Sequence, residues 1–310
     1  MPHVKSSPPL SLVLHGGAWN IPEDLVEPHR RGLRVAIKAG WGVLKKGGSA
    51  VDAVVESIGI MEDDETFDAG RGSFINAAGE VELDASIMDG STFKAGAVAA
   101  VQNIRHPITL ARKVMEESEH VMLVGMGASR FAREHGITLC GQDDLITQRE
   151  LERWRSLQGD AKYKTRDAFR KREHPTGTVG AVALDARGNI VSGTSTGGTP
   201  NKYPGRVGDS PLIGCGTYAD NLVGGVSTTG WGEAMIKVVM AKTVIDLMDR
   251  HGNDPERAVM EGLKILERKA GGFGGVIAIN NAGKVAIAYN TPRMARATMT
   301  NAMNTPKIDV

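Results

Sequence analysis

The chain has 310 residues, of which 41% are hydrophobic and 24% charged, the composition of an ordinary globular protein. Lys and Arg number 37 against 36 Asp and Glu, so the net charge of +1 provides no global field that would attract nucleic acid or an anionic membrane. A small-molecule partner is therefore expected, and the two cysteines, Cys140 and Cys215, are too few for a disulfide framework.

The first elements are a strand and two helices. Residues 10–14 predict a buried strand that ends in the glycine turn His15-Gly16-Gly17. This apolar run is too short for a signal-peptide core, and no stretch is long enough to span a bilayer, so a cytoplasmic protein is expected. Helical spacing follows over residues 28–46 and, after Ser49 as an N-cap, over residues 50–61.

The middle of the first half mixes loops, strands and helices. Residues 62–75 predict a polar loop, residues 84–90 and 95–102 two strands, and residues 107–116 a helix. Residues 121–129 form a partial strand-to-helix turn of the dinucleotide-binding type, with Gly125 and Gly127 but without the third glycine. A dinucleotide-dependent enzyme is therefore one alternative.

The composition changes at residue 148. Residues 148–177 are crowded with charged side chains and poor in aliphatic ones, which predicts a solvated linker rather than a nucleic-acid-binding patch. A hairpin then begins at Thr178, with strands over residues 178–184 and 190–196. Helices are predicted over residues 234–248 and 255–269, and a last hairpin over residues 276–289. Strands cluster with strands and helices with helices, which predicts an α+β fold.

The junction between this linker and the strand after it points to chemistry. If the peptide bond between Gly177 and Thr178 were cut, Thr178 would become an N-terminal residue whose hydroxyl attacks a carbonyl while its own α-amine takes the proton. An α-amino group titrates at about 7.7–8.0, so a useful fraction is neutral at physiological pH. Gly177 tolerates the strained geometry of an N-to-O acyl shift. Taken alone, the short motif Gly177-Thr178-Val179-Gly180 is more typical of a plain strand start than of a catalytic residue.

Further motifs favour the catalytic interpretation. Residues 177–185 (GTVGAVALD) resemble the nucleophile strand of the plant-type asparaginases, the isoaspartyl aminopeptidase branch of the N-terminal-nucleophile hydrolases. The same resemblance is carried by HGG at 15–17, GGSAVDAV at 47–54, LDASIMDG at 83–90, TSTGG at 194–198, GRVGDSP at 205–211 and STTG at 227–230. These motifs stand in the order of that family and cover nearly the whole chain.

The resemblance implies a fold and an activity. The fold is a four-layer αββα sandwich of the N-terminal-nucleophile hydrolase type, made by a single domain of residues 1–310 that cuts itself into an α fragment, 1–177, and a β fragment, 178–310. The activity is hydrolysis of the side-chain amide of L-asparagine and of the isopeptide bond of β-aspartyl dipeptides. A homodimer of cleaved units is implied, with no cofactor except a sodium ion held by backbone carbonyls of the 62–72 loop.

The resemblance also implies roles for individual residues. Thr178 is the nucleophile, and Thr196 orients its hydroxyl. Arg206 clamps the substrate α-carboxylate with its planar guanidinium, and Asp209 holds the α-ammonium. The remaining members of the implied substrate-binding set are Thr229 and Gly230, as oxyanion-hole donors, and Gly232.

Two departures from the family pattern and three alternative functions stay open. Asp68 stands where the family has asparagine, and Trp231 where close relatives carry histidine or another residue; both affect substrate preference without removing a reacting group. The turn around His15 is expected to support the nucleophile rather than to react. Besides the dinucleotide enzyme, the alternatives are an uncut precursor that only binds, and a different target within the class, as in the glycosylasparaginases and threonine aspartases.

Overall fold

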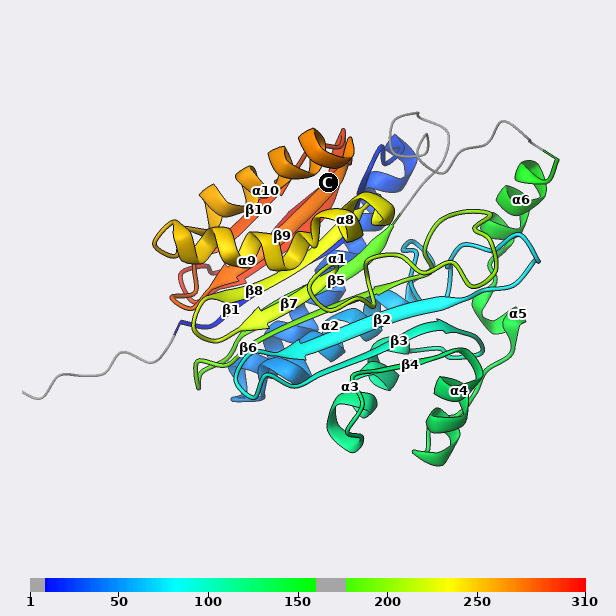
Figure 1. Ribbon diagram of the computed structural model, residues 1–310, viewed down its shortest axis with the longest axis horizontal. Helices are drawn as coiled ribbons and strands as arrows, with labels where there is room; N and C mark the ends of the chain where they lie inside the picture. The colour runs from blue at the N-terminus through cyan, green and yellow to red at the C-terminus, as the bar shows by residue number, and fades with distance from the viewer. Residues whose placement is uncertain (1–8, 160–176) are drawn as a thin grey trace, which may run out of the picture.

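The computed structural model describes residues 9–159 and 177–310, and two β-sheets stack face to face at its centre (Figure 1). The larger sheet has the strand order β12-β11-β1-β5-β6-β2-β3-β4 and the smaller one the order β10-β9-β8-β7. The strands of the larger sheet are β1 (Ser11–Trp19), β2 (Leu83–Asp89), β3 (Ala95–Val101), β4 (Met122–Val124), β5 (Thr178–Leu184), β6 (Ile190–Thr196), β11 (Arg293–Thr300) and β12 (Lys307–Asp309). Those of the smaller sheet are β7 (Thr217–Asp220), β8 (Gly224–Gly230), β9 (Gly274–Asn280) and β10 (Val285–Tyr289).

Helices cover the outer face of each sheet (Figure 1). The smaller sheet is covered by α9 (Met240–Arg250) and α10 (Pro255–Ala270), with α8 (Gly232–Val238) beside them. The larger sheet is covered by α1 (Glu23–Lys45), α2 (Ala50–Asp63) and α3 (Pro107–Glu117). At its β4 edge lies α4 (Gly125–Glu134), and α5 (Gln142–Leu145) and α6 (Gln148–Leu157) follow in the chain. The α+β class predicted from the sequence is confirmed.

An apolar core between the two sheets fixes their spacing. Side chains from the facing strands, such as Val13, Val182 and Ile277, are fully buried there. Because β5 has β1 on one side and β6 on the other, its backbone is paired along its whole length. The start of β5 is therefore a rigid position, which places Thr178 directly opposite Thr196 of β6.

Local signals located several helices correctly. Ser49 accepts a hydrogen bond from the backbone amide of Asp52, whose side chain accepts one in return, so the predicted N-cap of α2 is a complete capping box. The apolar face predicted for the first helix is buried along α1. However, α1 begins at Glu23 and not at residue 28, because Glu23 and Asp24 stabilise a first turn that precedes Pro28.

The predictions for the first strand and for the helix over residues 234–248 also need correction. The first strand does not end at His15-Gly16-Gly17: β1 continues to Trp19, and a bulge between His15 and Ala18 accommodates the glycines. The predicted helix over residues 234–248 is broken at Val239, whose φ is 49°, because the first amides of α9 donate to the carbonyls of Gly214 and Cys215.

The charged segment that begins at residue 148 is not a linker throughout. Its first part is the helix α6, with Thr147 as N-cap, because the charges pair with one another along the helix and bury Glu150. The rest of the predicted linker, residues 160–176, lies outside the described residues. Within the described ranges no helix is both long and apolar enough to cross a bilayer, and a cytoplasmic location stays a prediction.

Candidate active site

The hydroxyl of Thr178 is held by its cross-strand neighbour. Thr178 Oγ1 donates to Thr196 Oγ1 at 3.1 Å, and the backbone amide of Gly198 donates to the same Thr196 oxygen at 2.9 Å. Thr196 in turn donates to Asp68 Oδ2 at 3.3 Å. All of these side chains are buried. The two residues predicted to act together are thus in contact, and their hydrogen bonds form a chain that ends on a carboxyl group.

Gly177 is wedged between β1 and the loop that carries Asp68. A Cβ added to Gly17, whose φ is 105°, would lie only 3.0 Å from the Cα of Gly177. A Cβ added to Gly177 would lie 3.5 Å from the Cβ of Asp68. The bulge in β1 therefore brings glycine backbone against the residue that precedes Thr178, which is a close approach that a larger residue at position 17 would prevent.

His15 connects the start of β5 to β8 of the smaller sheet. Its Nδ1 lies 2.9 Å from the carbonyl oxygen of Thr178, and its Nε2 lies 2.9 Å from Ser227 Oγ. A carbonyl oxygen only accepts, so Nδ1 carries the proton and Nε2 accepts from Ser227. Burial lowers the pKa of His15 to about 3, so the ring is neutral. His15 positions Thr178, and neither of its nitrogens faces the Thr178 hydroxyl.

Arg206 and Asp209 form a second group of side chains, which meet at the backbone of Gly232. A Cβ on Gly232 would lie 2.9 Å from Asp209 Oδ1 and 3.0 Å from Arg206 Nη2. Asp209 is buried, accepts from Thr228 Oγ1 at 2.9 Å, and has its pKa raised by burial to about 6. Only a hydrogen atom fits between the two charged groups, which explains why a glycine occupies position 232.

The guanidinium of Arg206 is oriented by an acidic partner. Glu233 Oε1 accepts from Arg206 Nε at 2.9 Å and lies 2.8 Å from Nη2. The Nη1 side of the fork points toward Gly198, where a Cβ would lie 3.3 Å away. Since Gly198 also donates to Thr196, the free side of the guanidinium lies next to the loop that contacts the hydrogen-bonded pair Thr178 and Thr196.

Thr229 and Gly230 lie at the end of β8, directly after the residues that contact His15 and Asp209. The strand pairs with β9 there, and Gly230 has a φ of 143°. The next residues, Trp231 and Gly232, begin α8. By contrast, the partial dinucleotide turn lies on β4 and α4, at the edge of the larger sheet and separated from β5 by three strands.

The sequence model of the asparaginase family matches residues 8–307. The chain belongs to the asparaginase family. It is 43% identical over 286 residues to an isoaspartyl peptidase/L-asparaginase from Xenopus laevis, a match that covers 92% of this chain and 91% of the relative. It is 44% identical over 287 residues to an isoaspartyl peptidase/L-asparaginase from Danio rerio, and this match also covers 92% of this chain and 91% of the relative. It is 42% identical over 311 residues to a plant-type L-asparaginase from Pyrococcus abyssi, a match that covers 97% of this chain and 100% of the relative.

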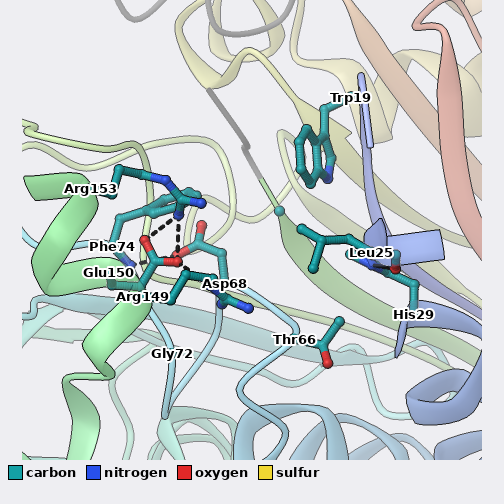
Figure 2. Close-up of a pocket in the computed structure, with 11 residues that line it drawn as sticks. Trp19, Leu25, His29, Thr66, Asp68, Gly72, Phe74, Arg149, Glu150 and Arg153 are labelled. Carbon is teal, nitrogen blue, oxygen red and sulfur yellow. Dashed lines mark hydrogen bonds and ion pairs between the residues drawn. The ribbon is translucent and has the colours of Figure 1, made fainter. Parts of the chain in front are cut away.

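In this asparaginase-family chain Asp68 faces a small pocket as well as Thr196. Figure 2 shows Asp68 near Glu150 and Arg153, with Trp19 and Leu25 on the opposite side of the pocket. Asp68 Oδ1 accepts from the backbone amide of Phe74 at 3.0 Å. Burial raises the pKa of Asp68 well above its usual range, and the negative charge of Glu150 adds to this effect.

Sequence reasoning did not identify three polar side chains of this asparaginase-family site. Ser227 and Glu233 stand inside or next to recognised motifs, yet their partners are distant in sequence. Lys202 is buried, and its Nζ donates to the carbonyl of Glu82 at 2.8 Å. A buried lysine in a loop has no local signature, since its neighbours Asp84 and Asp68 come from other elements.

Proposed function

We propose that the chain is an autoprocessing threonine amidohydrolase with Thr178 as nucleophile. It would hydrolyse the side-chain amide of L-asparagine and the isopeptide bond of β-aspartyl dipeptides. The relative from Xenopus laevis is named as an isoaspartyl peptidase/L-asparaginase, and the one from Pyrococcus abyssi as an L-asparaginase. The observation that carries the proposal is the position of Thr178: it begins a buried strand, and its hydroxyl is oriented by Thr196 at 3.1 Å. A nucleophile held this way needs only a free α-amine as its base.

The substrate clamp follows from charge complementarity. Arg206 would pair with the α-carboxylate through the side of its fork that Glu233 leaves free, and Asp209 would pair with the α-ammonium. Both charges must be matched before the side-chain carbonyl reaches Thr178. This double requirement selects free α-amino acids that carry an amide on the β-carbon.

The reaction then takes two steps. Thr178 Oγ1 attacks the carbonyl carbon, the α-amine takes the hydroxyl proton and passes it to the leaving nitrogen, and a β-aspartyl ester remains on the enzyme. Water hydrolyses that ester and releases aspartate. Thr229 and Gly230 would donate to the oxyanion in both steps, a role worth about 3–4 kcal/mol per donor.

Cleavage would leave the two fragments joined in one domain of the N-terminal-nucleophile αββα type. The strand β1 belongs to the first fragment, yet it pairs with β5 and β11 of the second. In the same way β2 pairs with β6 across the cut. Separating the fragments would tear the larger sheet apart. Association of two such units into a homodimer is part of the proposal and is testable by light scattering.

The 62–72 loop is proposed to hold a sodium ion through backbone carbonyls. At Gly70, whose φ is 55°, the carbonyl oxygens of Glu62 and Arg105 lie 2.4 and 2.7 Å from the position a Cβ would take. Glycine at position 70 therefore allows these two backbone carbonyls to approach the loop closely. A bound cation would neutralise them and stiffen the loop that carries Asp68. Thermal unfolding in sodium compared with a bulky organic cation tests this.

Intact mass spectrometry and a denaturing gel test the central claim. The wild-type chain of 33.0 kDa should yield fragments of roughly 19 and 14 kDa, in proportion to their residue numbers. Thr178→Ala should remain whole, because it lacks the attacking hydroxyl. If Thr178→Ala is cut at the same bond, Thr178 is not the nucleophile.

A further inference from the structure

Self-cleavage needs a base that the mature enzyme does not need. In the uncut chain the nitrogen of Thr178 belongs to a peptide bond and has no basic lone pair. The α-amine that serves turnover therefore does not exist when the first bond is broken. This question, and the inference below, rest on the proposed self-cleavage between Gly177 and Thr178.

The hydrogen bonds around Thr178 lead from its hydroxyl to one carboxyl group. Thr178 Oγ1 donates to Thr196 at 3.1 Å, and Thr196 Oγ1 donates to Asp68 Oδ2 at 3.3 Å. The other Asp68 oxygen accepts from the amide of Phe74 at 3.0 Å, which fixes the carboxylate plane. Each donor is followed by an acceptor, so one proton can move along the chain without any side chain changing position.

The other titratable groups of residues 9–159 and 177–310 do not reach this hydroxyl. His15 donates from Nδ1 to the carbonyl of Thr178, its Nε2 accepts from Ser227, and burial lowers its pKa to about 3. Lys202 Nζ donates to the carbonyl of Glu82. Of the ionisable side chains in the described ranges, Asp68 is the one that the hydrogen bonds of the Thr178 hydroxyl lead to.

Charges from several elements set the proton affinity of Asp68. Glu150 of α6 favours its neutral form, whereas Lys202 of the 197–216 loop favours the ionised form. Arg149 and Arg153 face the same pocket and pair with Glu150. His29 of α1 lines the pocket as well, but burial lowers its pKa to about 4, so it is neutral. A raised carboxyl pKa lies closer to neutrality, which suits a general base.

A path to solvent completes the arrangement. The pocket beside Asp68 encloses about 20 Å³, enough for one water molecule, and is lined by the charged side chains of α6. The carboxyl group lines this pocket (Figure 2) and also accepts the hydrogen bond from Thr196. It can lose its proton to the pocket.

We propose that Asp68 is the general base of self-cleavage and acts through Thr196. The Thr178 hydroxyl proton passes to Thr196 Oγ1 as the proton of Thr196 passes to Asp68 Oδ2, and Thr178 Oγ1 bonds to the carbonyl carbon of Gly177. The carbon–nitrogen bond then breaks as the Thr196 hydroxyl gives its proton to the leaving nitrogen of Thr178 and takes back the proton held by Asp68. Water hydrolyses the resulting ester, which yields a Gly177 carboxylate, a free α-amine and a regenerated hydroxyl.

The first test measures self-cleavage of freshly synthesised full-length chain between about pH 5 and pH 9, with the fragments quantified over time. The wild-type rate should rise with pH as Asp68 ionises and then level off. In Asp68→Asn, which keeps the acceptor for Phe74, the rate should fall at least about 100-fold and lose this pH dependence, as expected when a general base is removed. Equal rates and superimposable profiles would overturn the proposal.

The second test asks whether the threonine transmits the proton. Thr196→Val removes the hydroxyl at nearly constant volume, and Thr196→Ser retains it as a control. If the two residues act in one path, the double variant Asp68→Asn/Thr196→Val should cleave no more slowly than the slower single variant. If the loss of rate in the double variant equals the product of the two single losses, the two residues act independently, and the proposed path is refuted.

The third test changes the environment of Asp68 without touching the path. Glu150→Gln removes a negative charge and leaves Arg149 and Arg153 unpaired, and both changes favour ionised Asp68. The midpoint of the pH dependence of self-cleavage should move to lower pH, which purely structural damage would not produce. If the midpoint of the pH dependence does not move, Asp68 is not the group whose ionisation controls self-cleavage.

Failure of the inference can be told apart from failure of the proposed function. If the wild-type chain itself stays whole, the proposed function fails and this inference with it. If wild type and Asp68→Asn cleave alike, only the inference fails.

Discussion

Gly232→Ala should weaken substrate binding by pressing one methyl group between the two arms of the clamp. The new Cβ would lie 2.9 Å from Asp209 Oδ1 and 3.0 Å from Arg206 Nη2, whereas ordinary contacts of a Cβ begin at 3.4 Å. Asp209 cannot easily swing away, because Thr228 holds its other oxygen at 2.9 Å and its backbone nitrogen lies 3.2 Å from the new methyl. The carboxylate or the guanidinium must therefore move by about half an ångström.

The size of the effect follows from this displacement. A misplacement of about 1 Å costs about 100-fold in rate, so half of it should lower kcat/KM about tenfold, or about 1.4 kcal/mol. Because the clamp holds the aspartyl part common to both substrates, asparagine and a β-aspartyl dipeptide should lose the same factor. Self-cleavage does not use the clamp and should proceed at the wild-type rate.

Steady-state kinetics on both substrates measure this effect. The matched control is Gly59→Ala in α2, where a Cβ would meet no atom within 4 Å; its kcat/KM should equal that of wild type. A Gly232→Ala enzyme whose kcat/KM stays within twofold of wild type would show that Arg206 and Asp209 do not hold the substrate in the observed geometry.

The other predictions concern charge. Arg206→Ala should lose at least about 100-fold in kcat/KM on asparagine because the substrate carboxylate is left unpaired, and wild-type efficiency would refute the clamp. Burial raises the pKa of Asp209 to about 6, and its protonated form cannot pair with an ammonium, so kcat/KM should fall as the pH drops through about 6; a profile flat across that range would contradict this. In the mature enzyme, Asp68→Asn should move the alkaline-side rise of kcat/KM toward lower pH, because a nearby carboxylate favours the charged amine; superimposable profiles would mean that Asp68 does not act on it.

Features with local causes were predictable from the sequence. The capping box at Ser49 and the amphipathic α1 and α10 depend on residues within a few positions of one another. The contact between Thr178 and Thr196 follows from the pairing of two consecutive strands. Features with distant causes were not predictable: β8 is a Gly- and Thr-rich segment that becomes a strand because β7 and β9 flank it, and the break at Val239 depends on carbonyls of the 197–216 loop.

In the candidate site, too, features with local causes were predictable from the sequence and features with distant causes were not. Motifs located Arg206 and Asp209, but the pairing of Arg206 with Glu233 required the start of α8 to pack against the 197–216 loop. The ionisation of Asp209 likewise depends on burial, which no short motif encodes. The position of Asp68 could be suspected from its departure from the family pattern, yet its hydrogen bond to Thr196 and its exposure to the charges of α6 are tertiary properties.

In the proposed mechanism, Asp68 would affect maturation and turnover in opposite directions. Before the cut, the nitrogen of Thr178 is uncharged, and a carboxylate that accepts a proton through Thr196 would speed the attack on Gly177. After the cut, an ammonium group appears beside the same carboxylate, which then stabilises the charged amine and keeps the base of turnover protonated over more of the pH range. Replacing Asp68 with asparagine should therefore slow self-cleavage and, once the chain has been cut, improve hydrolysis near neutral pH. General damage to the site would lower both rates, so opposite changes in the two are the signature of a charge acting on two successive bases.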